Sequence, residues 1–421
     1  MHMRGILILR SIIIIMKSFK VSSKFGRKLP LPVMLFAAVS LLNEVSAQMV
    51  APLIPILIAA VFSAGPVAIG AVEGVADAIA AFLKLWSGRH ADVRPQRRKM
   101  MVFLGYGLAL LSRPFIGLAG SWGTIVALRG ADRLGKGLRG APRDAILADA
   151  TSIDMRGSAY GLNRGMDYAG AVLGTLIAAA ALAWWNMSIQ QVILLSIVPG
   201  LAVLVLLALL PNPTTQAQIN SAKNSVRTPL KWAALSPELR NYLKVLGFFC
   251  FARASEAFII LRGHELGQST VTLLLLWAWL AALQAITALV GAPITDRVPK
   301  STLTIFNWSS LVIAYAGLAF ASTTTGLWLA VSVYGLLSGI SEGVERALVS
   351  QLADPAEKGT AFGWYYMITG LAAIPAALVF GLVWKFAGPA SSFGLTAIIA
   401  FVSAIWLKMT LVHRQVSPTE N

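Results

Sequence analysis

The most unusual stretch of the sequence is RGADRLGKGLRGAPRDAILAD at 129–149, which holds eight charged residues within a strongly apolar chain. Four of its basic residues are three, four or seven positions apart, which puts them on one face of a helix: Arg129, Arg133, Lys136 and Arg143. A row of guanidinium and ammonium groups can hold a carboxylate or a phosphate through charge-assisted hydrogen bonds. Anion binding is therefore the chemistry that this stretch favours.

The elements that carry these charges are expected to lie in a membrane. Of the 421 residues, 57% are hydrophobic and 13% are charged, and the mean hydropathy is +0.72, whereas a soluble domain has about 25% charged residues. Apolar runs of membrane-spanning length predict an all-α integral membrane protein with twelve transmembrane helices, at 31–62, 66–87, 100–120, 123–148, 158–184, 190–210, 242–261, 271–294, 302–321, 326–350, 361–386 and 390–411.

Basic residues are concentrated in every second connection between these runs. The connections at 63–66, 120–123, 186–191 and 322–326 contain no Lys or Arg, whereas Lys and Arg occur at 17–28, 94–99, 156, 223–240 and 297–300. The positive-inside rule then places both termini in the cytoplasm, with cytoplasmic tails at 1–30 and 412–421. The net charge of +17 thus indicates topology, and we expect no nucleic-acid partner.

The chain contains an internal repeat. RGSAYGLNRGMDYAGAVLG begins at Arg156 and KGTAFGWYYMITGLAAIPA begins at Lys358, 202 residues later. Such self-similarity predicts two six-helix bundles related by pseudo-two-fold symmetry, at 31–210 and 241–411, joined by a cytoplasmic linker at 211–240.

Several motifs resemble those of the major facilitator superfamily over nearly all of 31–411. GRHADVRPQRRK (88–99) resembles its signature loop, RLGKGLRG (133–140) resembles its fourth-helix pattern, and GLNRGMDYAGAVLG (161–174) resembles a Gly-rich fifth-helix motif associated with exporters. VEGVADAIAAFLKLWSG, DRLGKGLRGAPRDAILAD and EGVERALVSQL resemble one prokaryotic branch, in which Asp and Glu usually stand where this chain has Glu44 and Gln48. The resemblance implies a secondary transporter in the cytoplasmic membrane of a bacterium or archaeon.

We expect the substrate cavity to be lined by polar and ionisable residues inside the apolar runs: Arg129, Arg133, Lys136, Glu44, Gln48, Glu73, Asp77 and Glu342. The first candidate for proton coupling is Glu44, near the helix-bending Pro52 and Pro55, and the second is Glu342. The remaining charges are expected to act in gating: Asp92, Arg97, Arg98, Arg143, Asp144, Arg164, Asp167, Asp296, Arg297, Glu345 and Arg346. The repeat places Glu345 and Arg346 opposite Arg143 and Asp144, which predicts a salt bridge across the cytoplasmic gate.

The function favoured is alternating-access transport of a small anionic or polar solute by a monomer, with proton coupling. The alternatives are a drug efflux pump and a lipid or lysolipid flippase of the same fold, and the cations could instead serve packing by neutralising buried carboxylates. An enzyme is not expected, because GKGLRG lacks the phosphate-loop spacing and the serines have no nearby His base. Neither a metal nor another cofactor is expected, since the four histidines are scattered and Cys250 is the only cysteine.

Overall fold

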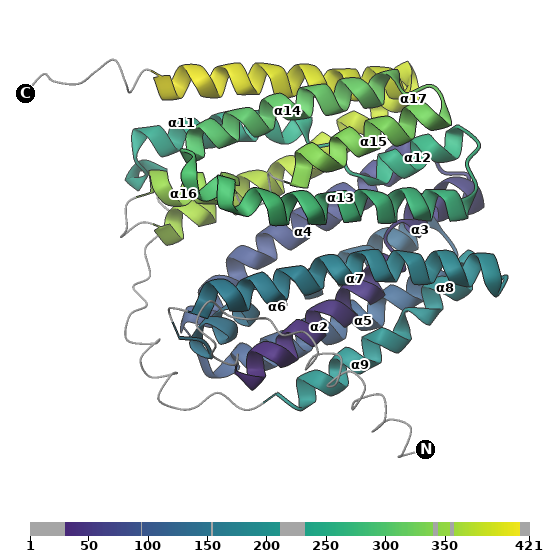
Figure 1. Cartoon of the computed structure of the whole chain (residues 1–421), viewed down its shortest axis with the longest axis horizontal. Coiled ribbons are helices and arrows are strands. Elements are labelled where there is room, and N and C mark those ends of the chain that lie inside the picture. The colour runs from purple at the N-terminus through teal and green to yellow at the C-terminus, as the bar shows by residue number, and fades with distance from the viewer. Residues whose placement is uncertain are drawn as a thin grey trace, which may run out of the picture.

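The computed structural model describes residues 30–93, 95–152, 155–210, 232–339, 344–353 and 358–412, and within these ranges all regular secondary structure is helical. The first half of the chain forms the lower layer of helices in Figure 1. Its helices are α2 (Leu31–Gln48), α3 (Leu53–Ile56), α4 (Pro66–Val93), α5 (Arg98–Phe115), α6 (Trp122–Asp149), α7 (Arg156–Trp184), α8 (Ile189–Leu195) and α9 (Ile197–Ala208). A π-helical turn at Leu57–Val61 extends α3, and 3₁₀ turns lie at Pro95–Arg97 and Ile116–Leu118.

The second half forms the upper layer in the same view. It consists of α11 (Pro237–Phe249), α12 (Ala257–Glu265), α13 (Thr270–Arg297), α14 (Lys300–Phe320), α15 (Thr324–Gly339), α16 (Val344–Leu352) and α17 (Lys358–Val412), with 3₁₀ turns at Trp232–Ala234 and Cys250–Ala252. The element α17 is two helices in one, because Gly388 has φ 84° and ψ 171°. A residue with a side chain rarely adopts this conformation, and Pro389 follows it.

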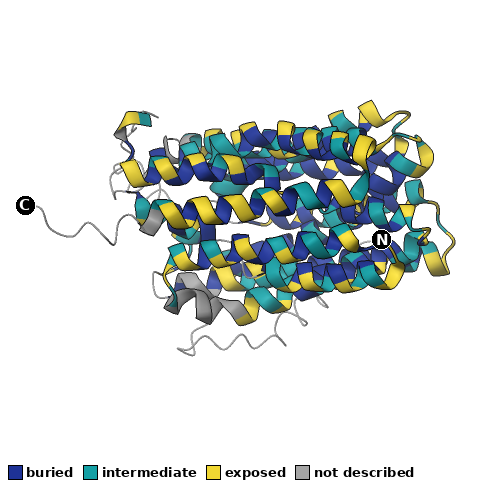
Figure 2. Ribbon diagram, turned by 90° about the horizontal axis from the view of Figure 1, so that it is seen from above, coloured by how far each residue is buried: buried dark blue, intermediate teal, exposed yellow. Residues whose placement is uncertain are grey.

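Large apolar side chains cover the outside of the helix assembly. Leu289 and Ile313 are each 64% exposed and Phe320 is 85% exposed, and exposed residues mark the outward faces of the helices in Figure 2. Water would disfavour such a surface, whereas lipid does not. Among the described residues, nine helical stretches are long and apolar enough to cross a membrane. The expectation of an all-helical membrane protein is confirmed at this level.

The two halves are joined by apolar packing at one end. One hydrophobic cluster contains Leu53 and Ile54 of the first half together with Phe258, Ile259 and Leu274 of the second. The helices α4 and α17 also approach closely: a Cβ at Gly70 would collide with the Ala377 carbonyl oxygen. This end, where α3 and α12 lie in Figure 1, is therefore sealed by apolar side chains of both halves.

At the other end of the first half, a second cluster contains no residue of the second half. It gathers Val33, Phe36, Ile146, Leu147 and Leu210. Among the described residues, the buried apolar clusters thus join the halves at the α3 and α12 end, and polar residues can occupy the space between the halves at the opposite end.

A tight helix crossing within the first half gives a test of this packing. A Cβ at Gly174 of α7 would come within 2.8 Å of the Val45 Cα of α2, whereas a Cβ at Gly165 of the same helix would meet nothing within 4 Å. Gly174→Ala is therefore expected to destabilise the protein by about 1–3 kcal/mol, and Gly165→Ala to leave it unchanged or slightly stabilised. Thermal unfolding in detergent measures both variants, and equal Tm values would contradict the crossing.

Candidate functional site

A polar cavity of about 810 Å³ lies between the two halves. It is lined by α2, α4, α6 and α7 from the first half and by α13–α17 and residues 249–256 from the second. Two smaller cavities, of about 330 and 280 Å³, share lining residues with it, and Lys136 lines all three. A residue of the predicted cationic row therefore stands where the cavities meet.

Glycines fix the position of α6 beside this space. A Cβ at Gly137 would lie 2.6 Å from the Leu83 Cβ of α4, and one at Gly135 would lie 2.8 Å from the Ala109 nitrogen of α5. Two faces of α6 are thus held against neighbouring backbones, as small residues allow in membrane helices. A third face carries Lys136 and Arg139 into the cavity.

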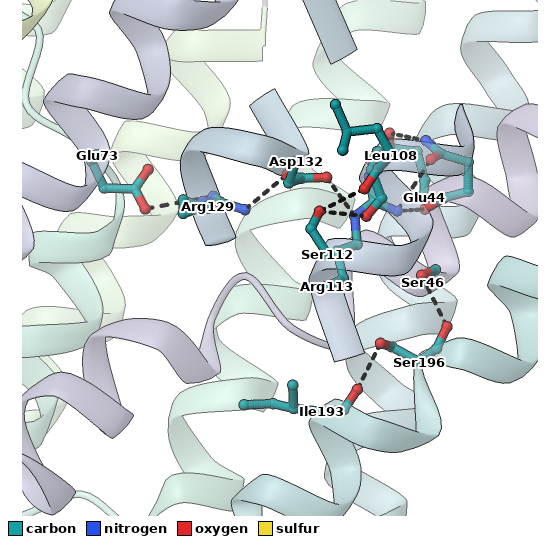
Figure 3. A network of polar contacts seen from close by, with 12 residues as sticks. Glu44, Ser46, Glu73, Leu108, Ser112, Arg113, Arg129, Asp132, Ile193 and Ser196 are labelled. Atoms are coloured by element: carbon teal, nitrogen blue, oxygen red, sulfur yellow. Dashed lines mark hydrogen bonds and ion pairs between the residues drawn. The ribbon is translucent and has the colours of Figure 1, made fainter. Parts of the chain in front are cut away.

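One cation of the predicted row forms ion pairs with two carboxylates, although its buried Nε has no hydrogen-bond partner. Arg129 is 6% exposed and lies 3.5 Å from both Glu73 of α4 and Asp132 of its own helix. Asp132 also accepts a 2.8 Å hydrogen bond from Arg113 of α5, as Figure 3 shows. Arg129 and Glu73 line the smallest cavity, but their charges are already matched there, so they are positioned to hold helices together.

The same network reaches Glu44. Arg113 donates from Nη1 to the backbone oxygen and to Oδ1 of Asn43, each at 3.2 Å, and Asn43 Nδ2 donates to Glu44 Oε1 at 3.0 Å. Sequence reasoning missed Arg113 and Asn43. Arg113 lies within the apolar run 100–120, and a charged residue inside a membrane segment usually has a role. This was the sequence signal that could have identified Arg113.

Two other cations of the row, Arg133 and Lys136, are available to a ligand. In the described part of the chain, no carboxylate lies within the 4.0 Å ion-pair distance of Arg133 or Lys136, and the buried Arg133 Nε has no hydrogen-bond partner. Two further cations lie over aromatic rings, namely Arg139 over Tyr106 at 4.1 Å and Lys84 over Tyr366 at 5.8 Å.

Two expected carboxylates also face cavities without a described cation at ion-pair distance. Glu44 lines the largest and smallest cavities, and Asp77 lines the two smaller ones. Gln48 lines two cavities and accepts a 3.0 Å hydrogen bond from Trp277 Nε1 of α13. This bond joins the two halves across the cavity.

The expected gate salt bridge between Arg143 or Asp144 and Glu345 or Arg346 is not formed in this structure. Arg143 and Asp144 pair with each other at 3.1 Å. Glu345 instead pairs with Arg253 and accepts hydrogen bonds from Trp308 (3.1 Å) and Tyr365 (3.3 Å), all within the second half. Arg346 is exposed and lines the cavity. The four expected gate residues therefore line one cavity without joining across it.

The other expected gating residues lie near the helix ends. Arg164 and Asp167 of α7 lie 3.8 Å apart and line the large cavity. Arg98 pairs with Asp149 at 2.8 Å, and Arg97 is exposed. The backbone of α4 includes Asp92 and that of α13 includes Asp296 and Arg297, but their side chains are outside the description. Glu342 lies outside the described residues.

A break in the predicted helix 242–261 supplies cavity residues that the sequence analysis did not select. The chain leaves α11 through the 3₁₀ turn Cys250–Ala252 and resumes at α12. Between them lie Arg253 and Glu256, which both line the large cavity, and Gln284 Nε2 donates to Glu256 at 2.7 Å. The presence of Arg253 and Glu256 in the apolar run 242–261 was the sequence signal that could have identified them as cavity residues.

Replacing a cation that forms a buried ion pair should destabilise the protein more than replacing one that forms none. Arg113→Met leaves Asp132 buried with a weaker partner, which is expected to cost about 3 kcal/mol, whereas Arg133→Met removes no described ion pair and should cost much less. Adding Asp132→Asn to Arg113→Met should recover part of the loss. Thermal unfolding in detergent reports these differences, and equal losses for the two single variants would be inconsistent with the pairing.

The sequence is similar to known proteins over most of its length. The family model of the Major Facilitator Superfamily matches residues 36–377. An uncharacterised MFS-type transporter of Methanocaldococcus jannaschii is 27% identical over 387 residues, covering 90% of this chain and 95% of the relative.

Solved structures share the fold at low identity. A peptide transporter POT in complex with sulfate superposes with a TM-score of 0.75 at 14% identity, covering 93% of this chain and 96% of the other. The human organic anion transporter MFSD10 gives a TM-score of 0.64 at 17% identity, covering 89% and 98%. The match of the family model to more than half of the chain settles the identification: the protein is a member of the major facilitator superfamily, a family of membrane transporters.

Proposed function

We propose that the protein is a secondary active transporter that moves a small anionic or polar solute across the cytoplasmic membrane by alternating access, coupled to protons. The observation that carries this proposal is the pair Arg133 and Lys136, which line cavities between the halves without a described carboxylate at ion-pair distance. Cations that are not directly paired with a carboxylate can bind an anion in such a site, where electrostatic attraction is stronger than in bulk water.

Twelve membrane crossings fit the helices. The turn at Gly388 divides the longest of the nine apolar spans into two. The helix α6 is long enough to cross but carries many charges, and α11 with α12 makes a crossing interrupted at residues 250–256. The two bundles would then be 31–210 and 241–411, joined by the linker 211–240, as parallel repeats with a central site.

The charge of the connections gives the orientation. The basic residues Arg97 and Arg98 lie at the end where α6 finishes, because Arg98 pairs with Asp149. The positive-inside rule favours a cytoplasmic location for this end. The cavity residues Asp144 and Arg164, with side chains 50% and 44% exposed, lie near it. We infer an inward-open state of a monomer in a bacterial or archaeal cytoplasmic membrane, and the exposure of these two side chains supports it.

Charge balance supports proton coupling. The smallest cavity is lined by five basic side chains (Arg113, Arg129, Arg133, Lys136 and Arg139) and five acidic ones (Glu44, Glu73, Asp77, Asp132 and Glu256). An anion that enters this balanced set leaves excess negative charge in a poorly hydrated site, which favours protonation of a carboxylate. Glu44 is the first candidate, because it faces the cavity and is held by the neutral Asn43.

The proposal is tested in proteoliposomes that contain a pH-sensitive dye. A panel of carboxylates and phosphates is added outside, with cationic and neutral analogues as controls. At least one anion is expected to acidify the interior in a protein-dependent manner, and the cationic analogue is not. Transport of a cation in preference to its anionic analogue, or anion flux without proton movement, would overturn the proposal.

A further inference from the structure

The two walls of the large cavity differ in chemistry. The first half contributes one aromatic residue, Tyr168, and many charges, whereas the second half contributes six aromatic residues: Phe249, Trp277, Tyr315, Tyr334, Tyr365 and Tyr366. The second wall carries as many basic as acidic side chains: Arg253 pairs with Glu345, and Glu256 and Arg346 also line the cavity. The cavity therefore has one cationic wall and one aromatic wall.

Two of the aromatic residues present ring surface to the cavity. Phe249 and Tyr315 are 1% and 2% exposed and belong to the core, but Trp277 and Tyr366 are only half-buried. The Trp277 indole is held by its hydrogen bond to Gln48. Tyr366 is packed edge-on against Tyr365, with ring centroids 5.3 Å apart. Both rings are thus fixed in place before a ligand arrives.

The walls meet at Tyr366, whose ring lies 5.8 Å from Lys84 Nζ, while Lys84 and Lys136 line the same two cavities. A ligand with its charge at Lys136 therefore has aromatic surface within reach on the opposite wall. We propose, on the basis of the anion transport proposed above, that the substrate is a ring-bearing organic anion. Its carboxylate or phosphate binds at Arg133 and Lys136, and its ring packs against Trp277 and Tyr366.

With both walls in place, neither the anionic group alone nor the ring alone is expected to bind tightly. An inorganic anion would satisfy the cations but leave the aromatic wall in contact with water. A neutral ring would cover the aromatic wall but leave the cations without a counter-charge. Stacking on aromatic side chains and removal of apolar surface from water both favour the ring, and charge-assisted hydrogen bonds favour the anionic group.

Matched probes test the proposal in purified protein. Phenyl phosphate and glucose 6-phosphate are compared with inorganic phosphate, phenol and glucose by titration calorimetry at fixed pH and salt. At least one ring phosphate is expected to bind about tenfold more tightly than inorganic phosphate and than its own neutral ring. Equal affinity of inorganic phosphate and both ring phosphates would overturn the inference, as would no binding by either ring phosphate.

Variants distinguish the two parts of the site. Trp277→Leu and Tyr366→Leu are expected to weaken binding of the ring phosphates more than binding of inorganic phosphate and so to remove the preference for the ring, and Trp277→Phe should restore part of it. Trp279→Leu is the matched control, because Trp279 is exposed on the same helix and does not line the cavity. A ring preference that survives both leucine variants would overturn the aromatic wall as its cause.

Lys136→Ala separates the ring preference from the anion site itself. If Lys136→Ala weakens binding of every phosphate but no ring preference exists, the anion site stands and the ring-bearing substrate is wrong. If Lys136→Ala changes the affinity of no phosphate, the anion site itself is wrong, and the present inference fails with it.

Discussion

Glu44→Gln is expected to abolish accumulation of substrate driven by a pH gradient while permitting energy-independent exchange. Glutamine keeps the size of the side chain and can still bond to Asn43, which contacts Glu44 at 3.0 Å, but it cannot bind or release a proton. The variant with bound substrate can then still switch between its two conformations, which allows exchange, but the switch is no longer coupled to proton movement. Proteoliposomes measure both modes, first as uptake under an imposed gradient and then as exchange of labelled for unlabelled substrate.

The control for this experiment is Glu238→Gln, because Glu238 is exposed at the start of α11 and does not line the cavity. It should accumulate substrate normally. If Glu44→Gln also accumulates substrate normally, Glu44 is not the coupling residue, and the role passes to another cavity carboxylate such as Asp77.

The second large effect is expected from the available cations. Arg133→Ala and Lys136→Ala should each weaken anion binding by about 10- to 100-fold, the size of a lost charge-assisted contact. Arg133→Lys should not restore affinity if the contact is bidentate, because an ammonium cannot reproduce the guanidinium fork. Calorimetric titration with phosphate and with a transported anion, on protein that is monodisperse in detergent, measures the loss.

Lys385→Ala serves as the matched control, since Lys385 is exposed on α17 and lines none of the three cavities. Its affinity should equal that of the unmodified chain. Unchanged affinity in folded Arg133→Ala and Lys136→Ala protein would instead leave the cationic row with a role in packing alone.

The row of cations could be predicted from the sequence, but their individual roles could not. Spacing along one helix placed Arg129 beside Arg133 and Lys136 and suggested one role for all three. In the structure, Arg129 lies within 3.5 Å of Glu73 from a different helix, whereas Arg133 and Lys136 have no such neighbour among the described residues. Periodicity within one helix carries no information about which helix packs against it, so the engaged cation could not be separated from the available ones.

The break between α11 and α12 explains a second difference. The run 242–261 is apolar enough to predict one continuous helix, and the repeat predicted that Glu345 pairs across the gate. The chain instead leaves the helical path at Cys250–Ala252, which brings Arg253 to Glu345 within one half. Neither a proline nor a glycine lies within Cys250–Glu256 to signal this break. Arg143 and Asp144 pair with each other on the other side of the cavity, so the expected pair across the gate is not formed.

The central claim is that the cavity between the halves opens alternately to the two sides of the membrane. Cys250→Ala removes the only cysteine, and single cysteines then replace Ala141, which lines the large cavity, or Ala68, which is 8% exposed in the apolar seal and lines none of the three cavities. The measurement is the rate at which a membrane-impermeant maleimide labels each site from each side, with and without transported anion. We predict that Ala141→Cys is labelled from the cytoplasmic side and Ala68→Cys from the opposite side, and that the anion changes the two rates in opposite directions. Labelling of both sites from the same side, with rates that rise and fall together, would contradict alternating access.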